Sequence, residues 1–423
     1  MDNLGKIKML TAIRAQQSMT QEYMAKKLNC TPSYISKIES GKKSCSDDFI
    51  KRYKTALGAP DLPLTDEEAV VFKQQLYKWK DLITFDELDE AGKILPSLTN
   101  CVALTLYDGL KNLFYIFEAS YYRATKNNEA LDVAMSKIKG ITHLFNDEQA
   151  YWYNRQIGID ELSKLHYATA LQAFLQAEKA GDILNLNNAS LYLNMGNCLT
   201  SMGYASKALE YLEKSYKKAI AINDYSHDVY RRYFTAQNYS HTGRHLEAIE
   251  MLEGCLRDEK KKASATVTIG LIYRRIALAY LYMGDKAVAL QYIEKSAENI
   301  DDKRPAYSDH LYYKAIILFE NEKKHEGEIC LHRAIEIEAK STPSYIQYNA
   351  LKHSMTLNNV CSLNYVECDA VPKLLEFQMN LPLLACYKQL TAFYVKNNKN
   401  KAFHYLQLTN ELNEKLRKGE LSK

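Results

Sequence analysis

Small residues recur at a fixed spacing along most of this chain, and that spacing constrains the fold more than any other feature. Segments that begin near residues 151, 189, 229, 270 and 308 share a small residue, an apolar or aromatic residue, a turn and a later Ala, with a period of 38 to 41 residues. Weaker copies fit 111–145 and 383–416, whereas 341–380 is degenerate. A period of this length predicts helical hairpins that stack into a solenoid.

The pattern resembles tetratricopeptide repeats, slightly lengthened. The resemblance implies a right-handed superhelix whose concave face is lined by the first helix of each hairpin, with small residues where the two helices of a hairpin touch. The predicted fold class is therefore all-α. The repeat domain is expected over 65–423, with hairpins near 65–100, 111–145, 151–180, 189–223, 229–258, 270–300, 308–339, 341–380 and 383–416.

Composition supports a helical, intracellular protein. The 423 residues include only 8 Pro and 16 Gly, which favours helices over β-sandwiches. The nine cysteines are scattered singly, as in a reducing compartment, and no run of eighteen apolar residues occurs. We expect a cytoplasmic protein with no membrane partner, because the first residues also lack the apolar stretch of a signal peptide.

Positive charge is concentrated at the N-terminus. Residues 1–60 hold 11 Lys or Arg against 5 acidic residues, whereas the remainder holds 44 against 46. In this segment Thr20, Thr31 and Ser46 stand where helix N-caps are expected, and Pro32 stands at a first helical position. The spacing predicts a four- or five-helix unit that contains a helix-turn-helix, with a polyanion as its partner.

The stretch TQEYMAKKLNCTPSYISKIESGKK, residues 20–43, resembles the XRE/Cro-repressor class of helix-turn-helix domains, which are lambda-repressor-like. The resemblance implies that the unit binds double-stranded DNA at a palindromic operator, with the second helix of the motif in the major groove. Phosphate contacts are then expected from Gln21 and the Lys42–Lys43 loop, and base contacts from Ser33, Tyr34 and Lys37. The full expected DNA-binding set is Gln21, Thr31, Ser33, Tyr34, Ser36, Lys37, Lys42 and Lys43.

A domain boundary is expected immediately after this unit. Pro60 and Pro63 lie within four residues, so no helix should continue through them. The predicted organisation is a DNA-binding domain over 1–60, a linker over 61–64 and the repeat domain from 65 onwards.

The predicted groove of the repeats is rich in amide and tyrosine side chains. Asn and Gln can pair with the backbone of an extended peptide, Arg can hold a carboxylate, and Tyr supplies rigid contact area. We therefore expect the groove to bind a short peptide. The candidate contacts are Arg155, Asn194, Asn197, Tyr233, Gln237, Asn238, Arg274 and Tyr312. A register shift of one place would bring in Arg231 and Arg275.

A helix-turn-helix of this class followed by such repeats resembles the RRNPP family of Gram-positive bacteria, phages and plasmids, named for Rap, Rgg, NprR, PlcR and PrgX. Within that family the chain is most like the NprR/PlcR branch, and its length favours NprR. The resemblance implies transcription regulation in response to a quorum-sensing peptide. It also implies groove contacts through Asn residues and a homodimer whose geometry, and so its DNA binding, the peptide shifts.

Two alternatives stay open. A Rap-like regulator would also dephosphorylate or sequester a response regulator, with Gln74 and Gln75 as candidate water-orienting residues. A scaffold would instead bind a protein partner in the groove.

The usual sequence motifs of catalysis and cofactor binding are missing. No phosphate-binding loop, dinucleotide fingerprint, nucleophile elbow or H-E-x-x-H occurs. His241 and His245 are four residues apart, but Gly243 between them marks a turn, so we interpret them as surface residues and not as a metal pair. We expect no cofactor, no metal and no enzymatic activity.

Overall fold

The computed structural model describes residues 3–58, 66–84, 86–99, 108–225, 227–261, 266–300 and 306–419. Every regular element within these ranges is helical, which confirms the predicted all-α class. The chain divides into two compact units, Met1–Gln156 and Ile157–Lys423. The predicted linker at 61–64 lies outside the described residues. No helix within these ranges is both long and apolar enough to cross a lipid bilayer.

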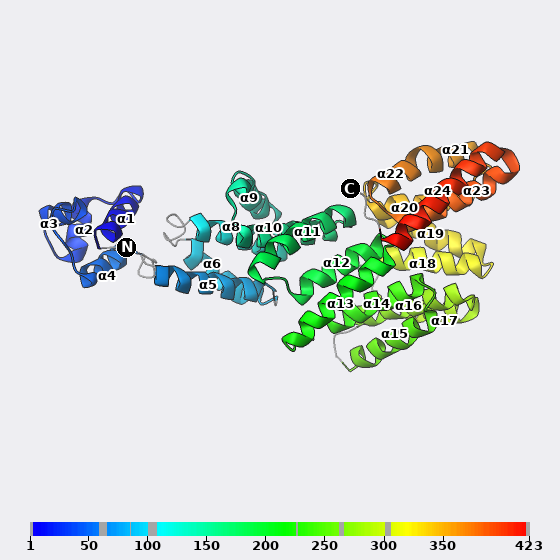
Figure 1. The fold of residues 1–423 in the computed structure, drawn as a ribbon, viewed down its shortest axis with the longest axis horizontal. Helices are drawn as coiled ribbons and strands as arrows, with labels where there is room; N and C mark the ends of the chain where they lie inside the picture. Colours follow the sequence, from blue (N-terminus) through cyan, green and yellow to red (C-terminus); the bar gives the residue numbers. More distant parts are fainter. Residues whose placement is uncertain are drawn as a thin grey trace. The chain divides into compact units, whose positions relative to one another are not determined.

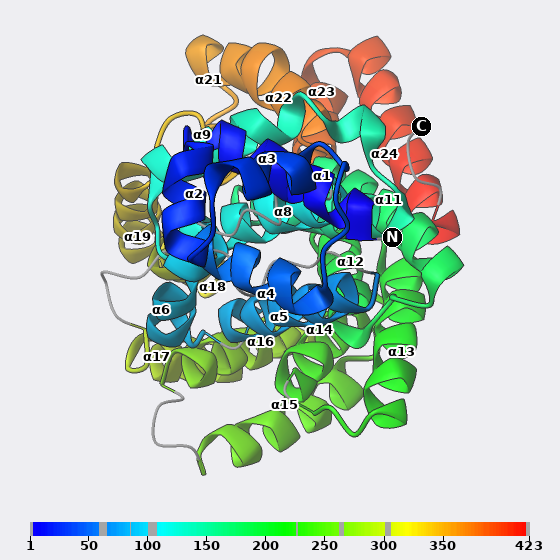
Figure 2. The same ribbon diagram turned by 90° about the vertical axis from the view of Figure 1, so that its left-hand side faces the viewer.

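Four short helices form the N-terminal part of the first unit (Figure 2): α1 (Asn3–Gln16), α2 (Gln21–Leu28), α3 (Pro32–Glu39) and α4 (Asp47–Ala56). The predicted N-caps are confirmed, since the hydroxyls of Thr20, Thr31 and Ser46 accept hydrogen bonds from backbone amides at the starts of α2, α3 and α4. Asn29 ends α2 in a left-handed conformation. These local signals set the short turn between α2 and α3.

Aromatic side chains anchor the later helices of the first unit. These helices are α5 (Asp66–Thr84), α6 (Leu88–Thr99), α8 (Asp108–Ala124), α9 (Asn128–Lys139) and the part of α10 (Asp147–Ser163) up to Gln156, with a 3-10 turn at Thr142–Leu144 before α10. Trp79 is fully buried, stacks on Phe114 at 5.8 Å between ring centroids, and donates to the carbonyl of Ala91 at 3.0 Å. Trp152 donates to the Tyr77 hydroxyl at 2.7 Å. Both indole N–H groups are therefore satisfied within the core.

The second unit is a series of helical hairpins that pack against their neighbours along the chain (Figure 1). Its helices are α11 (Tyr167–Leu184), α12 (Ala189–Ser201), α13 (Ala205–Ala221), α14 (Asp228–His241), α15 (His245–Glu259), α16 (Thr266–Met283), α17 (Lys286–Ala297), α18 (Ala306–Glu320), α19 (Lys324–Ile337), α20 (Pro343–Ser354), α21 (Val360–Asn364), α22 (Val371–Glu376), α23 (Asn380–Asn397) and α24 (Lys399–Lys418). This is the predicted tetratricopeptide-like solenoid.

Glycine sets the geometry of successive hairpins in two ways. Gly203, Gly243 and Gly284 lie in the turns between paired helices with φ of 86°, 84° and 88°, a conformation that side chains disfavour. Gly196 allows close helix contact, because a Cβ there would lie 2.7 Å from the Leu212 side chain. The small residues of the repeat are thus required by packing and not by chemistry.

In the segment with the degenerate repeat, 341–380, the second helix of the hairpin is interrupted. After α20 the chain forms α21, a π-helical stretch over Tyr365–Ala370, and then α22. Pro372 lies in the first turn of α22 and lacks the amide that an uninterrupted helix would need. The wider turn before it accommodates the missing donor, which accounts for the weak match of this segment to the repeat.

The second unit also closes on itself. The Asn380 side chain at the start of α23 donates to the carbonyl of Met202 at 2.9 Å, although 178 residues separate them. Phe377 stacks on His166 with 5.9 Å between ring centroids and 9° between planes. Helix α24 lies beside α13 (Figures 1 and 2). The last hairpin of the unit therefore contacts the first ones directly.

Candidate nucleic-acid interface and ligand cavity

Helix α3 presents a polar face to solvent. Ile35 and Ile38 are buried beneath it, whereas Ser33, Ser36 and Lys37 are exposed. Thr31 is also exposed and uses its hydroxyl to cap the helix by accepting from the Tyr34 amide at 3.2 Å. The side chains expected to read DNA bases are thus presented together on one surface.

The loop after α3 holds its cations beside that surface. Lys42 and Lys43 are exposed, and the backbone amide of Lys43 donates to the Lys37 carbonyl at 3.1 Å. The Lys43 ammonium lies 4.4 Å from the ring centroid of Tyr34. Tyr34 itself is half-buried and packs edge-on against Phe49 at 5.7 Å. Only part of Tyr34 is therefore available to a DNA base.

A buried polar network that the sequence did not reveal lies beneath α2 and α3. The Arg14 guanidinium binds both carboxylate oxygens of Glu39, at 2.7 and 2.9 Å, and also donates to the Met19 carbonyl at 2.6 Å. Gln21 donates to Glu39 at 2.8 Å, and the Tyr53 hydroxyl donates to the same carboxylate. Burial alone would raise the pKa of Glu39, but the hydrogen bonds, led by that from Arg14, hold this pKa below its ordinary value.

The network changes the interpretation of Gln21. Its side chain was expected to contact phosphate, yet its amide nitrogen is engaged with Glu39 at the start of α2. The network ties α1, α2, α3 and α4 together and so fixes the angle at which α3 is presented.

A cavity of about 240 Å³ opens in the second unit on the side of the first helices of its hairpins. Its lining comes from helices far apart in the sequence, namely α11, α12, α14, α16, α18, α20 and α23. The polar groups in this lining are Tyr167, Ser201, Gln237, His241, Arg275, Tyr282, Asp309, Tyr312, Tyr313, Ser344 and Gln347. The closing contact through α23 supplies an apolar wall of Leu381, Pro382 and Ala385.

Two of the predicted peptide-binding residues line this cavity, and one lies directly behind it. Gln237 and Tyr312 are part of the lining. Tyr233 is buried, and its hydroxyl accepts from Nε of Arg275 at 2.8 Å. Arg274 is only 4% exposed and donates to the Ala306 carbonyl at 3.4 Å, so it supports the wall.

The three predicted asparagines do not line the cavity. Asn238 is fully buried and donates to the Thr200 hydroxyl at 2.6 Å, so its side chain joins α14 to α12 instead of facing a ligand. Asn194 and Asn197 are half-buried on α12, where Asn197 accepts from Ser201 at 3.3 Å. For Asn238 the physical reason is register: the adjacent position, Gln237, is the one that faces the cavity.

Arg155 belongs to α10 in the first unit, where its guanidinium lies 5.4 Å from the Trp152 ring centroid.

Arg275 and His241 are candidate ligand contacts that are absent from the main set predicted from the sequence. Arg275 follows the predicted Arg274 by one residue, and His241 was expected to be an ordinary surface residue. Both line the cavity. Burial, followed by the charge of Arg275, lowers the pKa of His241 to about 4, so this imidazole is neutral near pH 7. The described residues contain no group of three or more potential metal-ligating side chains.

Several polar atoms around the cavity lack partners within the described part of the chain. They include Oε1 of Gln237 and Nδ1 of His241, both of which are shielded from solvent. Buried polar atoms without hydrogen bonds are costly, and groups of them mark sites where a ligand or ordered water completes the pairing. This cavity is therefore suited to a ligand that offers both donors and acceptors.

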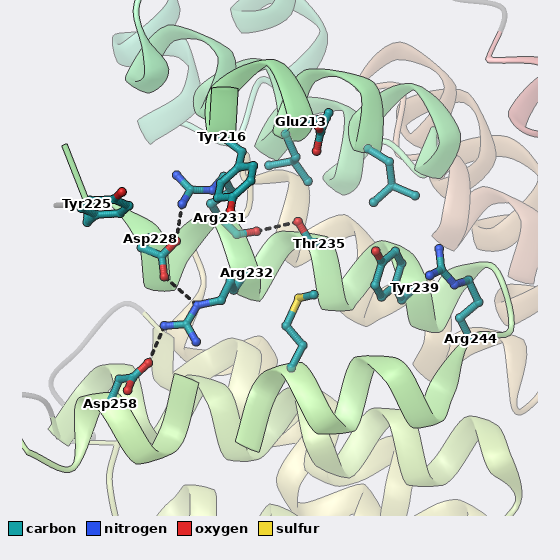
Figure 3. A pocket seen from close by; sticks show the side chains of 13 residues that line it. Glu213, Tyr216, Tyr225, Asp228, Arg231, Arg232, Thr235, Tyr239, Arg244 and Asp258 are labelled. Atoms are coloured by element: carbon teal, nitrogen blue, oxygen red, sulfur yellow. Dashed lines mark hydrogen bonds and ion pairs between the residues drawn. The ribbon is translucent and has the colours of Figure 1, made fainter. Parts of the chain in front are cut away.

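A second cavity, of about 760 Å³, lies between α13, α14 and α15 (Figure 3). It differs from the first cavity in that its arginines form ion pairs. Its Arg232 bridges Asp228 and Asp258, with both distances 2.7 Å, and Arg231 also pairs with Asp228. Arg244 binds Glu247 and lies over another wall residue, Tyr239. The charges of this larger cavity are matched internally, so it offers less to a ligand despite its size.

Comparisons with known proteins agree with this architecture. Residues 10–60 match a helix-turn-helix family model, and residues 189–223 match a tetratricopeptide repeat model. The chain is 22% identical over 215 residues to the transcriptional activator NprA of Geobacillus stearothermophilus, covering 48% of this chain and 52% of NprA. It is 25% identical over 225 residues to response regulator aspartate phosphatase E of Bacillus subtilis strain 168, covering 50% of this chain and 57% of that protein. The chain thus spans about half the length of these curated relatives.

Solved structures extend the likeness of the fold over most of the chain. The crystal structure of NprR in complex with its cognate peptide NprX has a TM-score of 0.70 at 16% identity, covering 81% of this chain and 99% of that one. A Rap protein complexed with competence and sporulation factor has a TM-score of 0.68 at 14% identity, covering 84% and 99%. At these identities the structures show a shared fold. Together with the two family matches and the NprA relative, they show that the chain is similar to NprR and NprA, with a helix-turn-helix followed by tetratricopeptide-like repeats.

Proposed function

We propose that the protein is a DNA-binding transcriptional regulator whose repeat domain binds a short signalling peptide. In this proposal a domain ending near residue 60 binds an operator, and the repeats from residue 65 onwards sense the peptide. The observation that carries it is the cavity on the first-helix side of the hairpins, where an amide, an imidazole and a guanidinium converge. NprR, which shares the fold, was crystallised with its cognate peptide, and NprA is a transcriptional activator.

The proposed mechanism is a population shift in a homodimer. Helices α14, α16, α18, α20 and α23 all contribute to the cavity, so a peptide that contacts several of them favours one curvature of the repeats. Two DNA-binding domains on a dimer can occupy both half-sites of a palindrome only at matching separation. The peptide then changes DNA affinity by at most its differential affinity for the two curvatures, typically about 5- to 150-fold.

The function is tested by selecting a peptide and then measuring DNA binding. The full-length protein is incubated with a synthetic random heptapeptide pool, and a recovered peptide is titrated by calorimetry. DNA is selected separately from a random duplex library. We expect the peptide to change the affinity for the selected duplex within the range given above. Tight peptide binding with unchanged DNA affinity would contradict the coupling, and co-purification of a folded protein in place of peptides would favour a scaffold.

Substitutions on the DNA-binding surface should separate two kinds of contact. Lys42→Ala is expected to weaken binding equally on selected and random duplexes, because a phosphate contact carries no sequence information. It should also reduce the slope of log binding constant against log salt concentration by about 1. Ser33→Ala or Lys37→Ala should instead change which duplex is preferred, at a cost of about 1 to 3 kcal/mol on the selected one. Gel-shift titrations at two salt concentrations measure both effects. Equal losses on both duplexes for all three variants would exclude base reading by α3.

A second candidate function is action on a response regulator, which the likeness to response regulator aspartate phosphatase E favours. Gln74 and Gln75 are exposed on α5 and are available to a partner. Release of phosphate from a panel of phosphorylated response regulators, compared between the wild type and Gln75→Ala, tests this activity. No release, and no complex with any regulator, would leave peptide-dependent DNA binding as the function.

A further inference from the structure

Two charged groups, Arg275 and Asp309, line the 240 Å³ cavity, and within the described residues neither forms an ion pair. Asp309 accepts a hydrogen bond from the neutral Tyr348 hydroxyl at 2.7 Å through one carboxylate oxygen. Arg275 donates only through Nε, to Tyr233. Among the residues that the structure describes, none pairs a carboxylate with Arg275. Within the described part of the chain, its two terminal nitrogens thus have no hydrogen-bond acceptor.

Aromatic rings hold the Arg275 guanidinium in place without neutralising it. The guanidinium carbon lies 5.4 Å from the ring centroid of Tyr233 and 5.8 Å from that of Tyr313. Arg274, the preceding residue, lies 5.3 Å from the same Tyr313 ring and has no acidic partner among the residues that the structure covers. Cation–π contact offsets only part of the cost of removing a guanidinium from water. The wall therefore carries a fixed positive charge whose planar fork is suited to a carboxylate.

The groups beside Arg275 would complete the contact with a peptide. Gln237 and His241 lie on α14, line the same cavity and each have an unpartnered buried atom, Oε1 and Nδ1 respectively. Oε1 of Gln237 can accept from a peptide N–H, and the neutral imidazole of His241 can donate or accept. These groups add hydrogen bonds without adding a second formal charge beside Arg275.

We propose that the ligand of this cavity is an anionic peptide, bound through a carboxylate paired with the terminal nitrogens of Arg275. This inference rests on the proposed peptide-sensing function and names the chemistry of its ligand. The carboxylate is either the C-terminus of the peptide or an Asp or Glu side chain, and both give the same bidentate geometry.

The test uses two synthetic random heptapeptide pools, one with a free C-terminal carboxylate and one with an amidated C-terminus. Each pool is incubated with the full-length wild-type protein, and retained peptides are sequenced by mass spectrometry. Enrichment of Asp and Glu in both pools identifies a side-chain carboxylate. Retention from the free-carboxylate pool alone identifies the C-terminus. Retained peptides with neither feature would overturn the proposal.

Variants make the test specific to Arg275. Arg275→Gln is expected to weaken binding of a recovered anionic peptide by about 10- to 100-fold, the range for losing a charge-assisted pair. The matched control is Arg333→Gln, since Arg333 lies on α19 with a side chain 62% exposed and outside the cavity lining. Circular dichroism checks that both variants are folded. If Arg275→Gln is misfolded, Arg275→Lys keeps the charge, loses the planar fork and should weaken binding by a smaller factor.

The outcomes separate this inference from the proposed function. If the wild-type protein retains no peptide from either pool, peptide sensing itself fails. If it retains peptides and Arg275→Gln binds them as tightly as the wild type, peptide sensing stands and the role of Arg275 is wrong.

Discussion

Replacing Glu39 with alanine is expected to destabilise the four N-terminal helices by about 3 to 5 kcal/mol, a loss comparable to the whole stability of so small a unit. The substitution leaves the partly buried Arg14 guanidinium without its carboxylate, because Arg14 donates two hydrogen bonds to Glu39 and would keep only the one to the Met19 carbonyl. It also removes the acceptor of Tyr53 and Gln21. Loss of α3 presentation should abolish DNA binding although Glu39 itself is buried.

Amide hydrogen exchange measures this effect locally. Peptides that cover α3 and α4 should exchange at least 100-fold faster in Glu39→Ala, whereas peptides from α12 to α24 should be unchanged. Glu22→Ala is the control, since Glu22 is exposed in the first turn of α2 and should change little. A double variant with Arg14→Met and Glu39→Leu should recover part of the protection, because it removes the unpaired charge. Unchanged exchange in Glu39→Ala would show that the network does not hold these helices together.

Acidification from pH 7 to pH 5 is expected to destabilise the second unit through His310, by about 2 kcal/mol. This side chain is 1% exposed, and burial, followed by the charges of Arg274 and Lys314, lowers its pKa from 6.5 to about 3. The unfolded chain therefore binds a proton between pH 6.5 and 3 that the folded chain excludes. The contribution of His310 to the free energy of unfolding is fully present above pH 6.5 and is lost progressively as the pH falls towards 3. His241, with its pKa near 4, acts in the same direction.

His310→Gln should remove about 2 kcal/mol of that pH dependence, whatever its effect on stability at pH 7. In the wild type Nδ1 of His310 lies 3.1 Å from the Ser296 hydroxyl, which donates to the Gly270 carbonyl, so the neutral ring donates to Ser296. Urea unfolding at pH 7 and pH 5 is followed by far-ultraviolet ellipticity, because both tryptophans, Trp79 and Trp152, belong to the first unit.

The control for this experiment is His332→Gln, because the His332 side chain is 64% exposed in the wild type. This variant should leave the difference in unfolding free energy between pH 7 and pH 5 unchanged. If His310→Gln kept the full acid sensitivity, the buried imidazole would not be its source.

Local chemistry made the N-terminal helices predictable, whereas contacts between distant residues did not show in the sequence. The caps at Thr20, Thr31 and Ser46 depend on residues three places away, so a short stretch suffices to identify them. The network around Glu39 joins residues 14, 21, 39 and 53, and the local sequence pattern does not indicate that these residues are in contact.

The repeats show the same division between local and distant information. Their period predicted stacked hairpins, because small residues at helix crossings repeat with the hairpin itself. The direction in which each side chain points depends on how successive hairpins pack on one another. Arg274 and Arg275 are adjacent in sequence, yet Arg274 is buried in the wall and Arg275 lines the cavity. In the same way, Asn238 is buried and Gln237 lines the cavity. Periodicity alone cannot resolve a shift of one residue.

The contact between Asn380 and Met202 also bears on how the second unit melts. A linear solenoid has free ends, and its terminal hairpins fray first because each has a neighbour on one side only. Here the terminal hairpin bonds back to the turn after α12, so no hairpin between them is an end. Opening that junction would expose the cavity wall formed by Leu381 and Pro382 and would return the array to end-fraying behaviour. The cooperativity of unfolding in this unit is thus set at one junction, where the two ends of a ring meet.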